Sequence, residues 1–269
     1  MRERGDESID ERAARARDDV VTAGPSVSVV VPVRDGAAFL AEALASVLAQ
    51  DSLPVEVIVV DDGSADDSAG IAERAGPLVR VVRQAALGPA AARNRGVREA
   101  RGEWIAFLDA DDRWLAGQQR VQAAAVRAAP DADMVFGHVR QFFSPEWGRE
   151  GAPRPEVLRG VIPTAAWVRR SAFLATGGFS EEWRTAEWVE WMVRAERAGM
   201  RSVTVPDIVA ERRIHARNGA AKMGPGRLEY VRVARAAMAA RRAGGARVDG
   251  AAADSPGSAD SVAGGGIAP

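Results

Sequence analysis

Short apolar segments alternate with amphipathic ones through the first half of the chain. Four runs rich in large apolar residues lie at Val27–Val33, Val55–Val60, Val79–Val82 and Trp104–Leu108. Nearly continuous apolar runs of this length are typical of strands that are buried on both faces of a parallel sheet. We therefore predict four buried strands in this part of the chain.

The segments between these runs have helical periodicity. Leu40, Leu44, Val47 and Leu48 are spaced at i, i+4, i+7 and i+8, which places them on one face of a helix. Further helices are predicted over residues 66–75, 89–100 and 116–129. Alternating strands and helices predict an α/β fold with a mostly parallel, doubly wound sheet.

The pattern after Pro130 is less regular and predicts a mixed second half. The expected elements are one or two strands over Met134–Phe143, a strand and a short helix over Val161–Phe173, a turn at Gly177–Phe179, a helix over Ala186–Gly199, strands at Ser202–Val205 and Ile208–Ile214, and a helix from Arg227.

Both ends of the chain differ from the middle. Residues 1–25 are densely charged, and residues 243–269 are mainly Gly, Ala, Ser, Pro and Asp. Such segments bury too little apolar surface to offset the entropy cost of ordering. We predict one folded domain over residues 26–242, with a regular half at 26–115 and a mixed half at 116–242, between two tails.

The composition narrows the possible chemistry. The 269 residues carry 36 Lys plus Arg, 37 Asp plus Glu and no cysteine, which gives a net charge of −1. The charge balance disfavours nucleic-acid binding, and the lack of cysteine excludes disulfides, thiolate zinc sites and cysteine nucleophiles. No apolar run approaches the roughly 20 residues of a bilayer span, and the N-terminus lacks a signal-peptide core, so we expect a cytoplasmic protein without a transmembrane segment.

Carboxylates follow two of the predicted strands directly. The second strand runs into Asp61–Ser64 (DDGS) and the fourth into Asp109–Asp112 (DADD). Asp, Gly and Ser also form turns and helix caps, which is an equally good explanation for DDGS alone. Three carboxylates within four residues, however, repel one another unless a cation or donors compensate. Because ligands of open α/β sheets bind at strand ends, and because we expect these two ends to be adjacent, we predict a Mg²⁺ or Mn²⁺ site.

Four motifs and a turn, in this order, carry a resemblance to a known family. The segments VSVVVPVRDG, VEVIVVDDGSADDS, GPAAARNRGV and GEWIAFLDADD, followed by GGF, resemble family 2 glycosyltransferases with the GT-A fold over residues 26–218. The absence of GxGxxG after the first strand disfavours a dinucleotide-binding Rossmann protein. The resemblance implies an inverting, metal-dependent transfer of a sugar from a nucleotide diphosphate donor, expected to be a UDP-sugar. The acceptor class stays open among small molecules, glycans, peptides and proteins. Residues 26–115 would form the nucleotide-binding half and 116–242 the acceptor half.

The resemblance places the nucleotide-contacting residues at the strand ends. These residues are Val31, Pro32, Arg34, Asp61, Asp62, Gly88, Arg93, Asn94 and Asp109. Asp62 matches the carboxylate that accepts a hydrogen bond from uracil N3–H, and an acceptor-only carboxylate suits an imide donor. For Arg93 the alternative is a structural salt bridge.

The resemblance also implies a metal site. Asp109 and Asp111 match the DxD motif of the family: Asp111 would bind the Mn²⁺ or Mg²⁺ that bridges the diphosphate, and Asp109 would reach the ribose or the metal through water. His215 matches an element that completes the metal site or contacts the diphosphate, and a neutral imidazole suits that role. We expect Asp112 to be a helix cap or a supporting group, and His138 to be structural.

The acceptor side departs from the family pattern. The family usually has Glu-Asp-x-Asp in the helix after GGF, with the second acid as general base, whereas Glu187–Trp191 reads EWVEW and places Trp188 at that position. We expect Glu187 to be the base, with Glu190 as the alternative unless it forms a surface ion pair. Trp188 and Trp191 are expected to pack in the core; an aromatic platform for the sugar or the acceptor is the alternative.

Two other functions stay open. The missing aspartate at Trp188 favours a nucleotide-sugar-binding protein without transferase activity. A nucleotidyltransferase would share the sheet architecture, but the PVRDGAA segment after the first strand lacks the glycine cluster and the lysine of an activating loop. Donor binding without sugar transfer or donor hydrolysis would distinguish the binding protein from the transferase.

Overall fold

The computed structural model describes residues 24–144, 156–158, 162–215, 229 and 232–233. Both predicted tails lie almost wholly outside these residues, as does most of the helix expected from Arg227. The domain boundaries at residues 26 and 242 stay predictions. No helix among the described residues has the length and apolarity needed to cross a bilayer.

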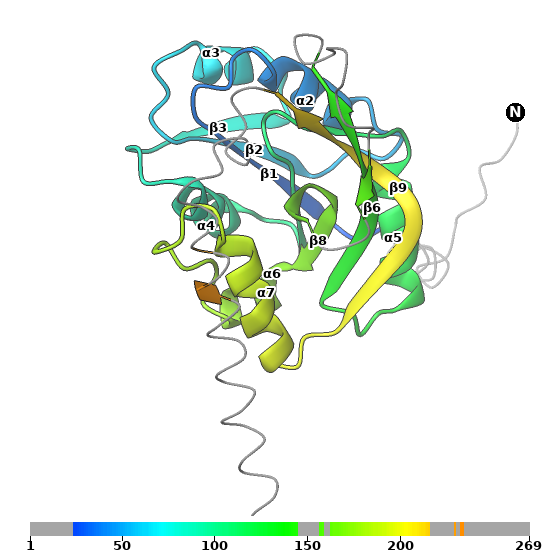
Figure 1. Cartoon of the computed structure of the whole chain (residues 1–269). Helices are drawn as coiled ribbons and strands as arrows, with labels where there is room; N and C mark the ends of the chain where they lie inside the picture. The colour runs from blue at the N-terminus through cyan, green and yellow to red at the C-terminus, as the bar shows by residue number, and fades with distance from the viewer. Residues whose placement is uncertain (1–23, 145–155, 159–161, 216–228, 230–231, 234–269) are drawn as a thin grey trace, which may run out of the picture.

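One mixed sheet forms the centre of the described residues (Figure 1). Its strands are β1 (Val27–Val33), β2 (Glu56–Asp61), β3 (Val79–Arg83), β4 (Trp104–Phe107), β5 (Arg113–Trp114), β6 (Met134–Phe143), β7 (Val157–Leu158), β8 (Ala166–Arg169) and β9 (Ser202–Ile214). They follow the order β3-β2-β1-β4-β8-β6-β9-β5, and β7 pairs with β6 beside this path. The strands β1 to β4 pair in parallel, whereas β8 runs antiparallel to both β4 and β6.

All four predicted strands are present, but only β1, β2 and β4 are buried as expected, whereas β3 lies at the edge of the sheet and is mostly half-buried. The other strands differ in detail from the prediction. The two-residue strands β5 and β7 were not predicted, because such short strands leave no periodicity in the sequence. The two strands expected after Gly199 are one strand, β9, whose register against β6 shifts between Phe136 and His138. Pro206 lies in the corresponding part of β9, and a proline has no N–H to donate to the ladder.

Helices cover both faces of the sheet (Figure 1). They are α2 (Leu40–Leu48), α3 (Ser68–Glu73), α4 (Pro89–Glu99), α5 (Gln118–Ala128), α6 (Arg170–Ala175) and α7 (Glu187–Arg197), with a 3₁₀ turn at Pro163–Ala165. The buried residues of α2, α3 and α5 belong to one apolar cluster, and those of α4, α6 and α7 to a second cluster. The described residues therefore form three layers, with the sheet in the middle.

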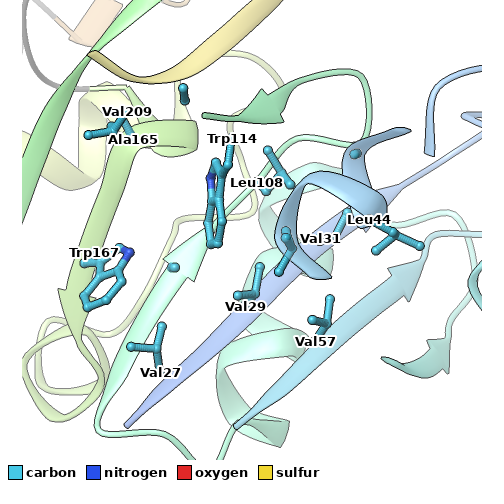
Figure 2. Packing of buried hydrophobic residues seen from close by; sticks show 14 of the residues in the cluster. Val27, Val29, Val31, Leu44, Val57, Leu108, Trp114, Ala165, Trp167 and Val209 are labelled. Atoms are coloured by element: carbon cyan, nitrogen blue, oxygen red, sulfur yellow. The ribbon is translucent and has the colours of Figure 1, made fainter. Parts of the chain in front are cut away.

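Alternate residues of β1 contribute to the two clusters. Val29 and Val31 pack with Leu44 of α2 (Figure 2). Val30 faces the other way, where Gly96 of α4 approaches so closely that a Cβ atom on residue 96 would lie 2.4 Å from Val30 Cγ1. A glycine at this position lets α4 lie directly on the sheet.

The strand order reverses between β1 and β4. The strands β2 and β3 lie on one side of β1, whereas α4 leads to β4 on the other side. In open α/β sheets a ligand crevice forms at such a switch point. The expectation that the acidic ends of β2 and β4 are adjacent was wrong, because β1 lies between them.

Candidate functional site

A pocket of about 550 Å³ opens at the carboxyl ends of β1, β2 and β4. Most of the predicted site residues line it: Pro32, Arg34, Asp62, Gly88, Arg93, Asp109, Asp111 and His215. Val31, Asp61, Asn94, Glu187 and Glu190 are not among its lining residues, and Val31 is buried in the apolar core instead. The structure thus brings together residues from both halves of the chain at the topological switch point.

The loop that follows β1 is bound to the loop that follows β2. The Asp35 N–H donates to Ser64 Oγ at 3.0 Å, and the Ala65 N–H donates to Asp35 Oδ1 at 2.7 Å. The Gly36 N–H donates to Ser68 Oγ at 3.0 Å. Asp35 adopts a φ of 52°, which aspartate tolerates better than most residues. These bonds hold the two loops together at one wall of the pocket.

The two aspartates of DDGS have different roles. Asp61 Oδ1 accepts the Ser64 N–H at 3.0 Å, so Asp61 closes the turn. The Asp62 carboxylate lines the pocket and accepts 2.8 Å hydrogen bonds from Gln84 Nε2 and from the N–H groups of Leu87 and Gly88. Asp62 therefore fixes the loop that leads into α4 and still faces the pocket.

Asn94 of the ARN motif connects α4 to the distant GGF turn. Asn94 Nδ2 donates to the Phe179 carbonyl at 2.8 Å, and Asn94 Oδ1 accepts the Phe179 N–H at 2.9 Å. Asn94 thus anchors the GGF turn. The prediction that Asn94 contacts the nucleotide was wrong for this structure, because Asn94 does not line the pocket.

Arg93 is the centre of a buried ion-pair network. Its Nη2 lies 2.5 Å from Asp109 Oδ1 and its Nη1 lies 2.6 Å from Glu187 Oε1. Burial acts to lower the pKa of Arg93, but the two adjacent carboxylates outweigh it and raise the pKa above its ordinary value. Arg93 is therefore charged at any ordinary pH. Arg93 lines the pocket, as expected for a nucleotide-contacting residue, and it also forms the structural salt bridges that were the alternative prediction.

The two candidate bases lie in different surroundings. Glu187 is the first residue of α7 and is 6% exposed, and its Oε2 is buried without a hydrogen-bond partner among the described residues. Glu190 instead binds Arg194 Nε at 2.7 Å and Nη2 at 2.9 Å. Arg194 in turn donates to the carbonyls of Thr176 and Gly178. Glu190 therefore belongs to a contact between α7 and the turn after α6.

The two tryptophans of α7 point into the second apolar cluster. Trp188 and Trp191 are 6% and 0% exposed, and their ring centroids lie 5.4 Å apart. Both stack with Phe179 in tilted or edge-on geometry. The expectation that they pack in the core is confirmed, and they form no aromatic platform in the pocket.

Asp111 and His215 meet in the pocket. His215 Nε2 lies 3.0 Å from Asp111 Oδ2, and the His215 ring packs against Phe39 with a centroid separation of 4.5 Å. Burial and the nearby Asp109 raise the pKa of Asp111, while the contact with His215 acts in the opposite direction. His138, in contrast, lies on β6 and is not among the residues that line the pocket.

Asp112 supports the contact between Asp111 and His215 without lining the pocket itself. Its carboxylate accepts Thr164 Oγ1 at 2.6 Å and the Arg213 N–H at 2.9 Å. Of the two roles expected for Asp112, the supporting role is confirmed, and the cap position of the next helix, α5, is occupied by Gly117. Asp112 holds the DADD loop against β9 and so places Asp111 next to His215.

The donor set fits a divalent cation. Oxygen ligands and an imidazole nitrogen suit Mn²⁺, and Mg²⁺ is commonly held by one or two carboxylates together with phosphates and water. No cluster of three His, Asp or Glu side chains that could hold a metal is preassembled within the described part of the chain. Asp109 is bound to Arg93 instead. The residues therefore fit a cation that takes its remaining ligands from a phosphate-bearing substrate and from water.

Among the pocket-lining residues that were not predicted from the sequence, three have polar or aromatic side chains. Asp35 and Phe39 follow β1, and Arg184 lies in the loop before α7. A polar or aromatic residue in a loop carries no signal of its own. Its place in the pocket depends on the packing of that loop against the rest of the fold.

Comparison with known proteins is consistent with this geometry. A sequence model described as "Glycosyl transferase family 2" matches residues 28–201. The succinoglycan biosynthesis protein ExoO of Rhizobium meliloti is 46% identical over 90 residues, which cover 33% of this chain and 26% of that protein. The chain therefore matches only about a quarter of the length of that relative.

Solved structures share the fold. S. aureus TarS (residues 1–349, in complex with UDP-GlcNAc) matches with a TM-score of 0.64 and 23% identity, over 79% of this chain and 65% of that one. The mannosyltransferase PcManGT from Pyrobaculum calidifontis, in complex with GDP-Man and Mn²⁺, matches with a TM-score of 0.56 and 25% identity, over 75% and 60%. The α/β fold of GT-A type that the sequence predicted is confirmed.

Proposed function

We propose that this chain, which belongs to glycosyl transferase family 2, transfers a sugar from a nucleotide diphosphate donor to an acceptor. The observation that carries the proposal is one pocket at the switch point that joins Asp62, Arg93, Asp109, Asp111 and His215. Its volume of about 550 Å³ lies within the usual range for ligand pockets. The nucleotide sugars bound to TarS and PcManGT add support from the fold.

We propose a UDP-sugar as the donor. The Asp62 carboxylate accepts three hydrogen bonds from the protein, two on Oδ1 and one on Oδ2. Because a carboxylate has about four acceptor positions, one position is left on Oδ2 for the imide N–H of a uracil. The surrounding bonds hold this oxygen in place before the nucleotide arrives.

Asp111 and His215 would hold Mn²⁺ or Mg²⁺, with Asp109 beside them. When bound, the cation stabilises the negative charge that develops on the departing nucleoside diphosphate. The protein's part is to orient its own groups. Arg93 holds Asp109, Asp112 fixes the backbone that carries Asp111, and Phe39 packs against the His215 ring.

Glu187 is our proposed general base. Arg93 holds its Oε1, which leaves Oε2 as the oxygen that would accept the proton of the acceptor hydroxyl. Because Glu187 does not line the pocket and Oε2 is buried, this role requires a rearrangement that exposes Oε2 when the substrates bind. Attack on the anomeric carbon from the face opposite the diphosphate inverts that centre in a single displacement. Glu190 is less suited, because both of its oxygens bind Arg194.

A nucleotide-sugar-binding protein without transferase activity is the second candidate. It is favoured by the buried ion pair of Glu187 and by Trp188, which occupies the usual aspartate position and faces the core. Donor hydrolysis or sugar transfer by the purified protein separates the two candidates, since a pure binding protein shows neither.

The decisive experiment is calorimetry of UDP binding with and without Mn²⁺. The wild type is expected to bind UDP in a Mn²⁺-dependent manner, and Asp111→Asn is expected to lose that dependence while keeping its thermal unfolding transition. Glu190→Gln serves as a matched control away from the pocket. Unchanged Mn²⁺-dependent affinity in Asp111→Asn would remove Asp111 from the site. A thermal-shift screen of nucleotide sugars then identifies the donor, because a ligand that binds only the folded state raises its stability.

A further inference from the structure

A carboxylate from beyond the family-matched residues binds the loop that precedes α7. Glu229 Oε2 accepts the Thr185 N–H and Thr185 Oγ1, both at 2.8 Å, and the Arg184 N–H at 3.1 Å. It also accepts the Ala186 N–H at 3.3 Å. Glu229 thus binds three successive backbone N–H groups, although residue 229 lies outside the matched range of 28–201.

A neighbouring residue of the same C-terminal segment contacts this loop as well. The guanidinium carbon of Arg232 lies 5.0 Å from the centre of the Trp183 ring, and Val233 is 3% exposed. The loop of residues 183–186 is therefore held from one side by Glu229 and Arg232. Burial acts to raise the pKa of Glu229, but the hydrogen bonds from Thr185, Arg184 and Ala186 lower it below the ordinary value.

The loop contributes one cation to the pocket. Arg184 lines the pocket together with Arg34 and Arg93. Arg93 is already paired with Asp109 and Glu187, whereas neither Arg34 nor Arg184 forms an ion pair with any residue that the structure describes. Arg184 thus brings to the pocket a guanidinium that has no ion-pair partner among the described residues.

We propose that Glu229 is a positioning residue, which holds the 183–186 loop so that Arg184 binds the diphosphate of the donor. This inference rests on the proposed function, since it needs an anionic nucleotide in the pocket. Charge-assisted hydrogen bonds to backbone N–H groups are strong, and the N-terminal end of α7 favours a negative group. The same contacts set the start of α7, where Glu187 is the first residue.

The test compares UDP with uridine, which lacks the diphosphate, on the full chain with Mn²⁺ present. Affinities are measured by ligand-observed NMR titration for the wild type, Arg184→Gln, Glu229→Ala, Glu229→Gln and the double variant Arg184→Gln/Glu229→Ala. Arg232→Gln is the matched control, because it removes the contact with Trp183 and leaves the hydrogen bonds of Glu229 in place. Thermal unfolding of each variant is recorded alongside.

Arg184→Gln is expected to weaken UDP binding about tenfold and to leave uridine binding unchanged. Glu229→Ala is expected to weaken UDP binding in the same selective way. Glu229→Gln is expected to weaken UDP binding less than Glu229→Ala does, and Arg232→Gln is expected to have the smallest effect. The double variant is expected to bind UDP as Arg184→Gln does, because both changes remove the same interaction.

Two outcomes would overturn the inference. One is that Arg184→Gln weakens the binding of UDP and of uridine by the same factor. The other is that the fold-loss of UDP affinity in the double variant equals the product of the fold-losses in the two single variants. Glu229 would then act independently of Arg184 and have only a structural role. If Glu229→Ala fails to fold, Glu229→Gln gives the same comparison. A wild type that binds neither ligand would instead contradict the proposed function itself.

Discussion

Arg93 and Glu187 are 94 positions apart in the sequence, yet Arg93 Nη1 lies 2.6 Å from Glu187 Oε1 in the buried centre of the protein. The pair links α4, which follows β3, to α7 on the proposed acceptor side. Arg93 also binds Asp109 at the end of β4, so one guanidinium orients a carboxylate from each half. The two halves of the site are therefore coupled through this residue.

Replacing Arg93 is expected to destabilise the fold as well as the site. Arg93→Gln leaves the buried Glu187 carboxylate without its partner, which costs about 3–5 kcal/mol in comparable buried pairs. Arg93→Lys is expected to restore little of this stability, because a single ammonium group cannot bind two carboxylates as the two Nη atoms of the guanidinium do. Urea unfolding monitored by circular dichroism measures the loss. Arg95→Gln, which removes an exposed ion pair with Glu99, is the control and is expected to change stability by less than about 1 kcal/mol. A loss in Arg93→Gln as small as that of the control would contradict the role of the network.

The choice between the two candidate bases is decided by turnover. We expect Glu187→Gln to lower kcat by a factor of about 100 or more with little change in the KM for the donor, since general bases typically contribute at least that much. Glu190→Gln is expected to retain activity to within a fewfold, because Glu190 serves the contact with Arg194. Steady-state kinetics with the donor found in the thermal-shift screen make the comparison. If neither substitution lowers kcat, another residue is the base.

Stability is expected to fall in acid partly because of Glu211. Burial acts to raise the pKa of Glu211, but Arg140 and Arg113 outweigh it and lower the pKa below its ordinary value of 4.5. A group with a lowered folded-state pKa stabilises the protein fully above its unfolded pKa, and this contribution is lost as the pH falls through the folded value. The difference in unfolding free energy between wild type and Glu211→Gln should therefore be largest near neutral pH and should shrink below about pH 4.5. A difference that is constant from pH 7 to pH 3 would contradict this assignment.

The contact between α4 and β1 is expected to tolerate no side chain at residue 96. Gly96→Ala places a Cβ atom 2.4 Å from Val30 Cγ1, so the helix or the strand must shift, and overpacking of this kind costs about 1–3 kcal/mol. In the double variant Gly96→Ala/Val30→Ala the new methyl group occupies part of the space that Val30 leaves. Its destabilisation should be smaller than the sum of the two single effects, as measured by thermal unfolding. Additive effects would show that the two side chains do not compete for space.

Local pattern and motif order determined much of what could be predicted. The apolar runs identified the strands β1 to β4 because strands inside a parallel sheet are mostly apolar, and Asp62, Asp109 and Asp111 were placed in the pocket because they closely follow β2 and β4. Each of these inferences uses only neighbours in the chain. The position of β1 between β2 and β4 could not be obtained in this way, since strand order depends on which face each connecting helix covers.

Only the tertiary structure decided which partners the site residues have. Asn94 and Asp61 looked like pocket residues by their motifs, but one binds Phe179 and the other closes a turn. The sequence by itself determined the α/β class, the strand ends and their carboxylates, because these depend on periodicity and adjacency. Two features of the site arise instead from contacts between residues far apart in the chain, and no local pattern encodes such contacts. They are the ion pair of Arg93 with Glu187 and the hydrogen bonds of Glu229 to the loop before α7.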